Sequence, residues 1–238
     1  LGITYSEEVC RRMADLSPAA ADFRIYWDNA YCVHHLYDDR QDTLPEILSM
    51  CRANGKEDMV LIFASTSKIS FAGAGISCIA ASLGNLEWVK KSMTIQIISH
   101  DKINQLRHVL YFQNLDGVKE HMRKHAAIMR PKFDLVLETL ERELNGLEIG
   151  TWTKPLGGYF ISFNTMDGCA KEVVEKCREA GVTLTGAGAT YPYKKDPHDS
   201  NIRIAPSYPT LEELKITSEL FVLCVKLVSV EKLLEKSA

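Results

Sequence analysis

What the sequence lacks narrows the kind of protein it encodes. Its 28 lysines and arginines are outnumbered by 31 aspartates and glutamates, and this balance argues against nucleic acid as the main partner. No uncharged apolar run approaches the roughly 18 residues that a membrane span needs, so we expect no membrane partner. There is no signal-peptide pattern, no internal repeat and no low-complexity tract.

The seven cysteines follow no framework spacing. Their number is odd and no pair has the CxxC spacing. A disulfide scaffold is short and dense in cysteine, so we expect reduced, mostly buried thiols in a cytoplasmic protein. No metal is expected either, because His121 and His125 lack a third ligand and are predicted to lie on a solvated helix face. For His34 and His35, packing in a loop or core is favoured over a pocket role.

The first half of the chain reads as alternating helices and strands, and the 46% hydrophobic content is enough for a sizeable core. The continuous apolar run at 59–64 is typical of a strand in a parallel sheet that helices cover on both faces. Together with a strand at 23–28, it predicts an α/β unit. Helices are predicted at about 6–15, 44–53, 76–97 and 101–112.

The second half predicts a smaller α+β lobe. A helical pattern runs over 115–145, and Pro131 inside it predicts a kink or a break. We place the domain boundary within this stretch, giving domains at 1–125 and 126–238. The remaining predicted elements are strands at about 148–153, 159–163 and 201–205, helices at about 168–180 and 210–235, and a loop at 181–200.

Two short polar segments follow predicted strands of the first half. Asp28 and Tyr31 lie at the end of the first strand, where ligands bind in open α/β sheets. Ser65-Thr66-Ser67-Lys68 follows the apolar strand, and a lysine buried at such a place is a nucleophile because burial disfavours its charged form. The alternatives are an aspartate that closes a strand above a packed tyrosine, and a solvated lysine. A nucleotide P-loop is excluded, because GxxxxGK[ST] is absent.

A third segment carries an arginine. Arg203 lies within an otherwise apolar short strand, where a guanidinium needs an anionic partner. Its planar fork suits a carboxylate, which could belong to a ligand or to an internal salt bridge.

In order and approximate spacing, the Asp-x-Ala-Tyr, Ser-x-Ser-Lys and late arginine elements resemble class I aminotransferases of pyridoxal-phosphate fold type I. The flank Ser-Thr-Ser-Lys-Ile-Ser-Phe-Ala-Gly-Ala-Gly looks most like the MocR-like subgroup that includes aspartate aminotransferases. Pro155-Leu156-Gly157-Gly158 resembles the family's glycine pair beside the substrate pocket, and Leu1-Gly2 the end of its Asn-Pro-x-Gly turn. The resemblance implies part of a mostly parallel large-domain sheet with helices, plus a smaller α+β domain.

The same resemblance implies a role for each site residue. Lys68 holds pyridoxal 5'-phosphate as an aldimine and shuttles the substrate proton. Asp28 pairs with the pyridinium nitrogen, and Tyr31 bonds the phenolic oxygen. Ser65 and Ser67 contact the phosphate. Arg203 clamps the substrate carboxylate.

The implied reaction is transamination between an amino acid, aspartate above all, and a 2-oxo acid such as 2-oxoglutarate, in a homodimer. Two alternatives stay open: a β-lyase or decarboxylase on the same scaffold, and the effector domain of a MocR-type transcription regulator. The sequence departs from the family at Ile76, where many aminotransferases have a phosphate-binding arginine. Because Leu1 is not a methionine, we also expect a segment covering only the later part of a complete family member.

Overall fold

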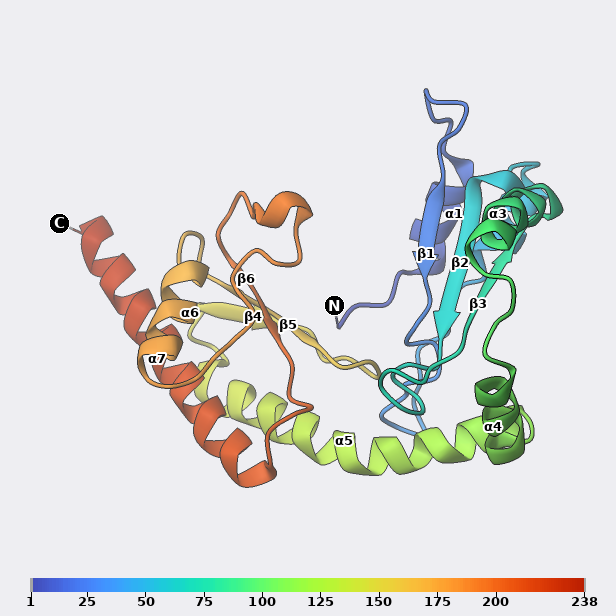
Figure 1. Ribbon diagram of the computed structural model, residues 1–238. Coiled ribbons are helices and arrows are strands. Elements are labelled where there is room, and N and C mark those ends of the chain that lie inside the picture. Colours follow the sequence, from blue (N-terminus) through green and yellow to red (C-terminus); the bar gives the residue numbers. More distant parts are fainter. Residues whose placement is uncertain (1, 238) are drawn as a thin grey trace. The chain divides into compact units, whose positions relative to one another are not determined.

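The computed structural model describes residues 2–237, which divide into two compact units (Figure 1). The N-terminal unit comprises residues 4–34 and 42–123, and the C-terminal unit comprises residues 2–3, 35–41 and 124–237. Leu1, one of the two residues read as the end of the family turn, lies outside the described residues. The switch from one unit to the other at 123 to 124 falls inside a long helix.

The N-terminal unit is built on a three-stranded sheet in the order β1-β2-β3. Its strands are β1 (Ile25–Asp28), β2 (Val60–Ser65) and β3 (Ser77–Ala81). Helices α1 (Glu7–Asp15) and α2 (Ile47–Ala53) share a buried core with Ile25, Trp27 and Val60, so they cover one face of the sheet. A short 3₁₀ helix, η1 (Glu57–Met59), leads into β2. The other face carries Asp28, because side chains alternate along a strand.

The helix predicted at 76–97 is wrong in its first part. Residues 77–81 form β3, which pairs with β2 in antiparallel register, and helix α3 (Leu83–Gln96) begins only after Ser82. Ser82 stops the strand and starts the helix, since its hydroxyl accepts the N–H of Asn85 as an N-cap. The sheet is therefore mixed in this chain: the expected parallel pairing is confirmed for β1 and β2 only.

Of the two outcomes predicted at Pro131, a kink or a break, the break is wrong. Helix α4 (Lys102–Phe112) is followed by α5 (Leu115–Leu144), which runs through the proline as one helix. Proline removes one helical N–H donor, which costs stability. Met129, Phe133 and Val136, on both sides of it, are buried in the core of the C-terminal unit. This burial offsets the lost hydrogen bond.

The C-terminal unit has the expected α+β character. Its antiparallel sheet, in the order β4-β5-β6, consists of β4 (Gly150–Trp152), β5 (Ile161–Thr165) and β6 (Asn201–Ile204). One face of the sheet, with Phe163 and Ile202, joins the main core together with residues of α5, α6 (Ala170–Glu179) and α7 (Leu211–Ser237). Residues 192–194 form a 3₁₀ turn, η2 (Pro192–Lys194). The opposite face carries Ser162 and Arg203, which are paired in register.

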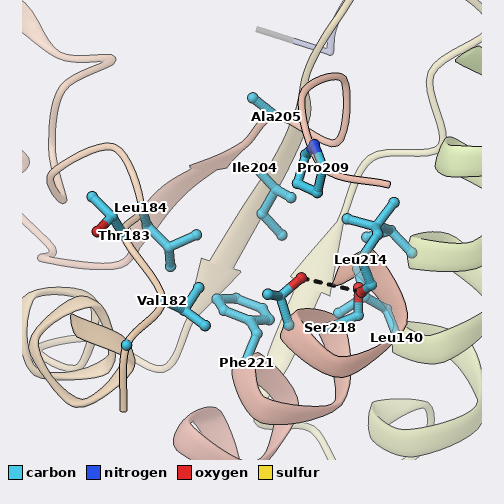
Figure 2. Close-up of a pocket in the computed structure, with 13 residues that line it drawn as sticks. Leu140, Val182, Thr183, Leu184, Ile204, Ala205, Pro209, Leu214, Ser218 and Phe221 are labelled. Atoms are coloured by element: carbon cyan, nitrogen blue, oxygen red, sulfur yellow. Dashed lines mark hydrogen bonds between the residues drawn. The ribbon is translucent and has the colours of Figure 1, made fainter. Parts of the chain in front are cut away.

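A cavity of about 230 Å³ lies on the apolar side of the C-terminal unit (Figure 2). Leu140 of α5, Phe221 of α7 and Val182 line it together with Ile204 at the end of β6. Because Ile204 faces this cavity, its neighbour Arg203 points to the other face of the sheet. None of the predicted site residues lines the cavity.

Three general features complete the description. The seven cysteines are free thiols and five are buried, which confirms the expected burial. Across residues 2–237, no helix has the length and apolarity to cross a bilayer. Within the same range, no three His, Cys, Asp or Glu side chains lie close enough together to hold a metal ion.

Asp196 anchors the loop before β6, and its replacement should destabilise the C-terminal unit. The carboxylate accepts the backbone N–H groups of His198 (3.0 Å), Ser200 (2.8 Å) and Asn201 (2.8 Å). Burial raises the pKa of Asp196, but these donors outweigh it and the pKa is lowered overall. We expect Asp196→Ala to reduce the free energy of unfolding by about 1–3 kcal/mol at pH 7. Urea titration measures this loss.

The pH dependence follows from the sign of this shift. A lowered pKa gives stability that is present above the ordinary aspartate value near pH 4 and is lost as the pH falls through the folded value. The difference in free energy of unfolding between the parent and Asp196→Ala should therefore shrink below about pH 4. Asp39→Ala, an exposed position in the same unit, is the control and should show no such difference. If the free energies of unfolding of the parent and Asp196→Ala differ by a constant amount down to pH 2, this role of Asp196 is contradicted.

Candidate active site

Asp28, Tyr31, Ser65 and Lys68 meet at one edge of the N-terminal sheet. Strands β1 and β2 are parallel with Asp28 opposite Phe63, so both strands end on the same side. The Asn29 N–H donates to the Phe63 carbonyl at 2.7 Å and carries the pairing beyond β1. In the turns that follow, Lys68 Nζ lies 5.2 Å from the centre of the Tyr31 ring. The structure thus brings the two predicted segments together.

Asp28 is placed to receive a cationic N–H. Its side chain is exposed, and one carboxylate oxygen accepts the Ala30 N–H at 3.1 Å. In the part of the chain that the structure describes, no lysine, arginine or histidine forms an ion pair with it. Tyr31 is half-buried and stands edge-on to the His34 ring at 5.2 Å.

The hydroxyls of Ser65 and Ser67 form a pair that could hold an anion. They lie 2.9 Å apart, and the Ser65 hydroxyl also accepts the Ser67 N–H at 3.0 Å. Gly75 packs directly against this turn: a Cβ at that position would lie 2.8 Å from the Ser67 nitrogen and 2.9 Å from its Cα. Only glycine lets the returning chain approach Ser67 this closely.

Gly75→Ala should therefore destabilise the N-terminal unit. The added methyl group must push the backbone of Ser67 aside, and overpacking of this kind costs about 1–3 kcal/mol. Thermal and urea unfolding measure the loss. Gly186→Ala is the matched control, because a Cβ there meets nothing within 4 Å. Equal stability of the two variants would show that the turn yields without cost.

Of the two alternatives left open for Lys68, the structure shows the solvated lysine and not the buried amine. The expected activation rested on burial of the amine, whereas the Lys68 side chain is exposed in this chain. The strand before it is buried only at its beginning, at Val60 and Leu61, and opens toward its end. Desolvation by this chain therefore does not explain a reactive amine at Lys68.

Ile76 keeps a structural role at the position where the family arginine is expected. Its N–H donates to the Thr66 hydroxyl at 2.9 Å, and its carbonyl accepts the Thr66 N–H at 2.8 Å. These bonds close the 66–76 loop onto β3. The Ser65 and Ser67 hydroxyls remain as polar groups that this edge could offer to an anion.

Arg203 in the C-terminal unit has the surroundings of an anion site. Its guanidinium lies 4.5 Å from the centre of the Phe160 ring, and Nη2 donates to the Thr185 hydroxyl at 3.3 Å. Nε is buried without a hydrogen-bond partner. No carboxylate of residues 2–237 forms an ion pair with Arg203, so the alternative of an internal salt bridge is not found here.

Sequence reasoning favoured packing of His34 in a loop or core, which its burial bears out, but it missed the contacts that three histidines make beside Lys68. His34 is 4% exposed and contacts the Lys68 carbonyl, and His108 is 7% exposed and contacts Thr66 and Ser70. The solvated face predicted for His121 and His125 is wrong: both are half-buried, and His121 contacts the Ile69 carbonyl. No local sequence pattern predicts these contacts, because the two residues in each contact are separated by between 34 and 52 positions in the chain.

Comparisons with known proteins agree with this architecture. The family model described as "Aspartate amino-transferase" matches residues 1–237. A Mycolicibacterium smegmatis protein, provisionally named an aminotransferase, is 44% identical over 98% of this chain and 54% of its own length. The crystal structure of an aspartate transaminase from Corynebacterium glutamicum is 43% identical, with a TM-score of 0.93 over 97% of this chain and 54% of that chain.

A more distant structure shares the fold. The α-aminoadipate aminotransferase of Thermus thermophilus, solved with N-(5'-phosphopyridoxyl)-L-leucine, is 19% identical with a TM-score of 0.69 over 87% of this chain and 51% of that chain. Fold and relatives thus place the chain among the aminotransferases. More narrowly, it belongs to the aspartate aminotransferase family. The chain spans about half the length of the curated relatives it matches.

Proposed function

We propose that the protein containing this chain is an aminotransferase that uses pyridoxal phosphate and moves the amino group of aspartate to 2-oxoglutarate. The observation that carries the proposal is the convergence of Lys68, Tyr31, Asp28 and Ser65 at one strand edge. The substrate choice is supported by the 43% identity to an aspartate transaminase. The family also supports the cofactor.

The residues present fit pyridoxal phosphate on the part of the site that this chain supplies. Ser65 and Ser67 offer paired hydroxyls to the phosphate, in a turn whose close packing requires Gly75. Asp28 offers an exposed carboxylate to the ring nitrogen, and Lys68 offers a primary amine to the aldehyde. When bound, the cofactor supplies an electron sink for the bonds at the substrate Cα.

Each side chain then has a defined task. Lys68 would hold the cofactor through its aldehyde, and its amine would carry the proton from the substrate Cα. Asp28 keeps a proton on the ring nitrogen by its negative charge. Tyr31 donates its hydroxyl proton to the phenolic oxygen. Arg203 binds the substrate carboxylate through its fork and fixes the Cα–H bond for proton removal.

The wider assignments belong to the same proposal. Residues 1–125 form the later part of the large cofactor-binding domain and residues 126–238 the small domain. The subgroup is the MocR-like one, and the protein is a cytoplasmic homodimer. The subgroup is supported by the resemblance of the flank at 65–75. Within this flank, Gly75 packs against Ser67.

Borohydride trapping tests the proposed attachment. Reduction of the intact, cofactor-loaded protein should attach the pyridoxyl group to the peptide that contains Lys68, as peptide mass spectrometry shows. Attachment at another lysine would refute the role of Lys68. Oxo-acid-dependent transfer from aspartate is measured in parallel. Release of pyruvate and ammonia from β-substituted amino acids in its place would support the β-lyase alternative.

A further inference from the structure

Three histidines from separate elements contact the turn that carries Lys68. His34, in the turn after β1, places Nε2 3.2 Å from the Lys68 carbonyl oxygen. His121, in α5, places Nε2 2.8 Å from the Ile69 carbonyl oxygen. His108, in α4, places Nε2 2.7 Å from the Ser70 hydroxyl and 3.0 Å from the Thr66 hydroxyl. The turn at 66–70 is thus held from three sides.

The partners fix the tautomer of each ring. A carbonyl oxygen only accepts, so His34 and His121 each donate from Nε2. His108 Nδ1 lies 2.8 Å from the Asn104 carbonyl and must donate there. In the neutral ring this leaves Nε2 of His108 to accept a hydroxyl proton from Thr66 or Ser70. Each imidazole therefore makes a directional bond that an apolar side chain cannot replace.

These bonds act on the backbone of the turn and not on the amine itself. The Lys68 side chain is exposed and carries its amine on a long aliphatic stem, so the direction of its Cα–Cβ bond is set by the backbone at 68 and 69. His34 and His108 are buried at 4% and 7% exposure, which makes their hydrogen bonds costly to lose. A misplacement of about 1 Å at a reacting group can cost roughly 10²-fold in rate.

We infer that His34, His108 and His121 are positioning residues that hold the Lys68 turn in its reactive orientation. This inference rests on the proposed function, in which Lys68 carries the proton at the substrate Cα. The three rings act through the Lys68 and Ile69 carbonyls and the Thr66 and Ser70 hydroxyls. None of them needs to touch the substrate.

Paired substitutions separate the hydrogen bond from the bulk of the ring. Glutamine keeps an N–H donor near the Nε2 position, whereas leucine keeps only volume. We expect His121→Leu and His34→Leu to lower kcat by about 10- to 100-fold with KM changed less than about threefold. His121→Gln and His34→Gln should recover most of kcat. The pH titration of the cofactor absorbance should shift in the leucine variants and return in the glutamine variants.

A second measurement needs no cofactor. Hydrogen–deuterium exchange of the amides at 66–70 in the cofactor-free protein should speed up in the leucine variants and stay near the parent rate in the glutamine variants. His100→Leu, at an exposed position of the same unit, is the control and should change neither measurement. Ser70→Ala removes one of the two hydroxyls that contact His108, together with its bond to the Thr66 carbonyl, so it tests this part of the turn even if a leucine variant folds poorly.

The measurements distinguish failure of the positioning role from failure of the proposed function. If the parent protein traps the cofactor at Lys68 and the leucine variants and Ser70→Ala match its kcat, absorbance titration and exchange, the positioning role is overturned. If the parent itself traps no cofactor at Lys68, the proposed function fails, whatever the exchange rates show.

Discussion

Lys68→Ala should abolish transamination, lowering kcat by at least about 10⁴-fold. In the proposed function, the substitution removes both the amine that would hold the cofactor aldehyde and the base that would carry the substrate proton, and each of these contributions is large. The fold should survive, because the Lys68 side chain is exposed. Steady-state assays with aspartate and 2-oxoglutarate measure the loss, and borohydride should no longer label the peptide that contains position 68.

The control for this experiment is Lys91→Ala, an exposed lysine on α3. It should retain parental activity and parental trapping at Lys68. Activity of the Lys68→Ala protein within tenfold of the parent would contradict the assignment. Retained trapping elsewhere would place the reactive amine on another residue.

The sequence was sufficient to predict that Asp28 and Ser65 lie at the same end of the sheet, because each residue lies at the end of its own strand. Asp28 and Ser65 each end an apolar run, and parallel strands bring such ends to one side of a sheet. The parallel register of β1 and β2 meets this condition. The hydroxyls and the amine then follow within three residues of Ser65.

The errors come from longer-range effects. The residues at 77–81 read as helix, but pairing with β2 overrides that local preference, and the Gly73–Gly75 loop returns the chain into an antiparallel strand. Pro131 predicts a break, but burial of Phe133 and Val136 keeps α5 continuous. Both outcomes are decided by tertiary packing that no short window contains.

The contacts of the histidines in the site also depend on tertiary packing that a short stretch of sequence does not contain. The sequence predicts only that His108 lies in a helix at 101–112, whereas its partners are 38 and 42 residues earlier in the chain. The Lys68 side chain in turn is exposed, as in the solvated alternative that the sequence left open, and is not the buried amine. Chemistry can be read from residue types at a strand end, whereas the contacts that orient those residues depend on distant segments.

Arg203→Leu should lower kcat/KM by about 10²- to 10³-fold, mainly through KM. The loss corresponds to about 3–4 kcal/mol, as expected when one partner of a charged hydrogen-bonded pair is removed. Arg203→Lys should recover only part of it, because an ammonium group cannot make the bidentate contact or the planar stack on Phe160. The Thr185 hydroxyl would also lose its guanidinium donor.

Control variants distinguish loss of the contact between Arg203 and the substrate carboxylate from a general loss of structure. Arg178→Leu removes an exposed arginine of the same unit that pairs with Glu175, and it should leave kcat/KM unchanged. Trapping of the cofactor at Lys68 should persist in Arg203→Leu, since the proposed contact is with substrate. The KM for both the amino acid and the oxo acid should rise, because each presents the same carboxylate. An unchanged KM for both would show that the buried Nε of Arg203 serves something other than the substrate.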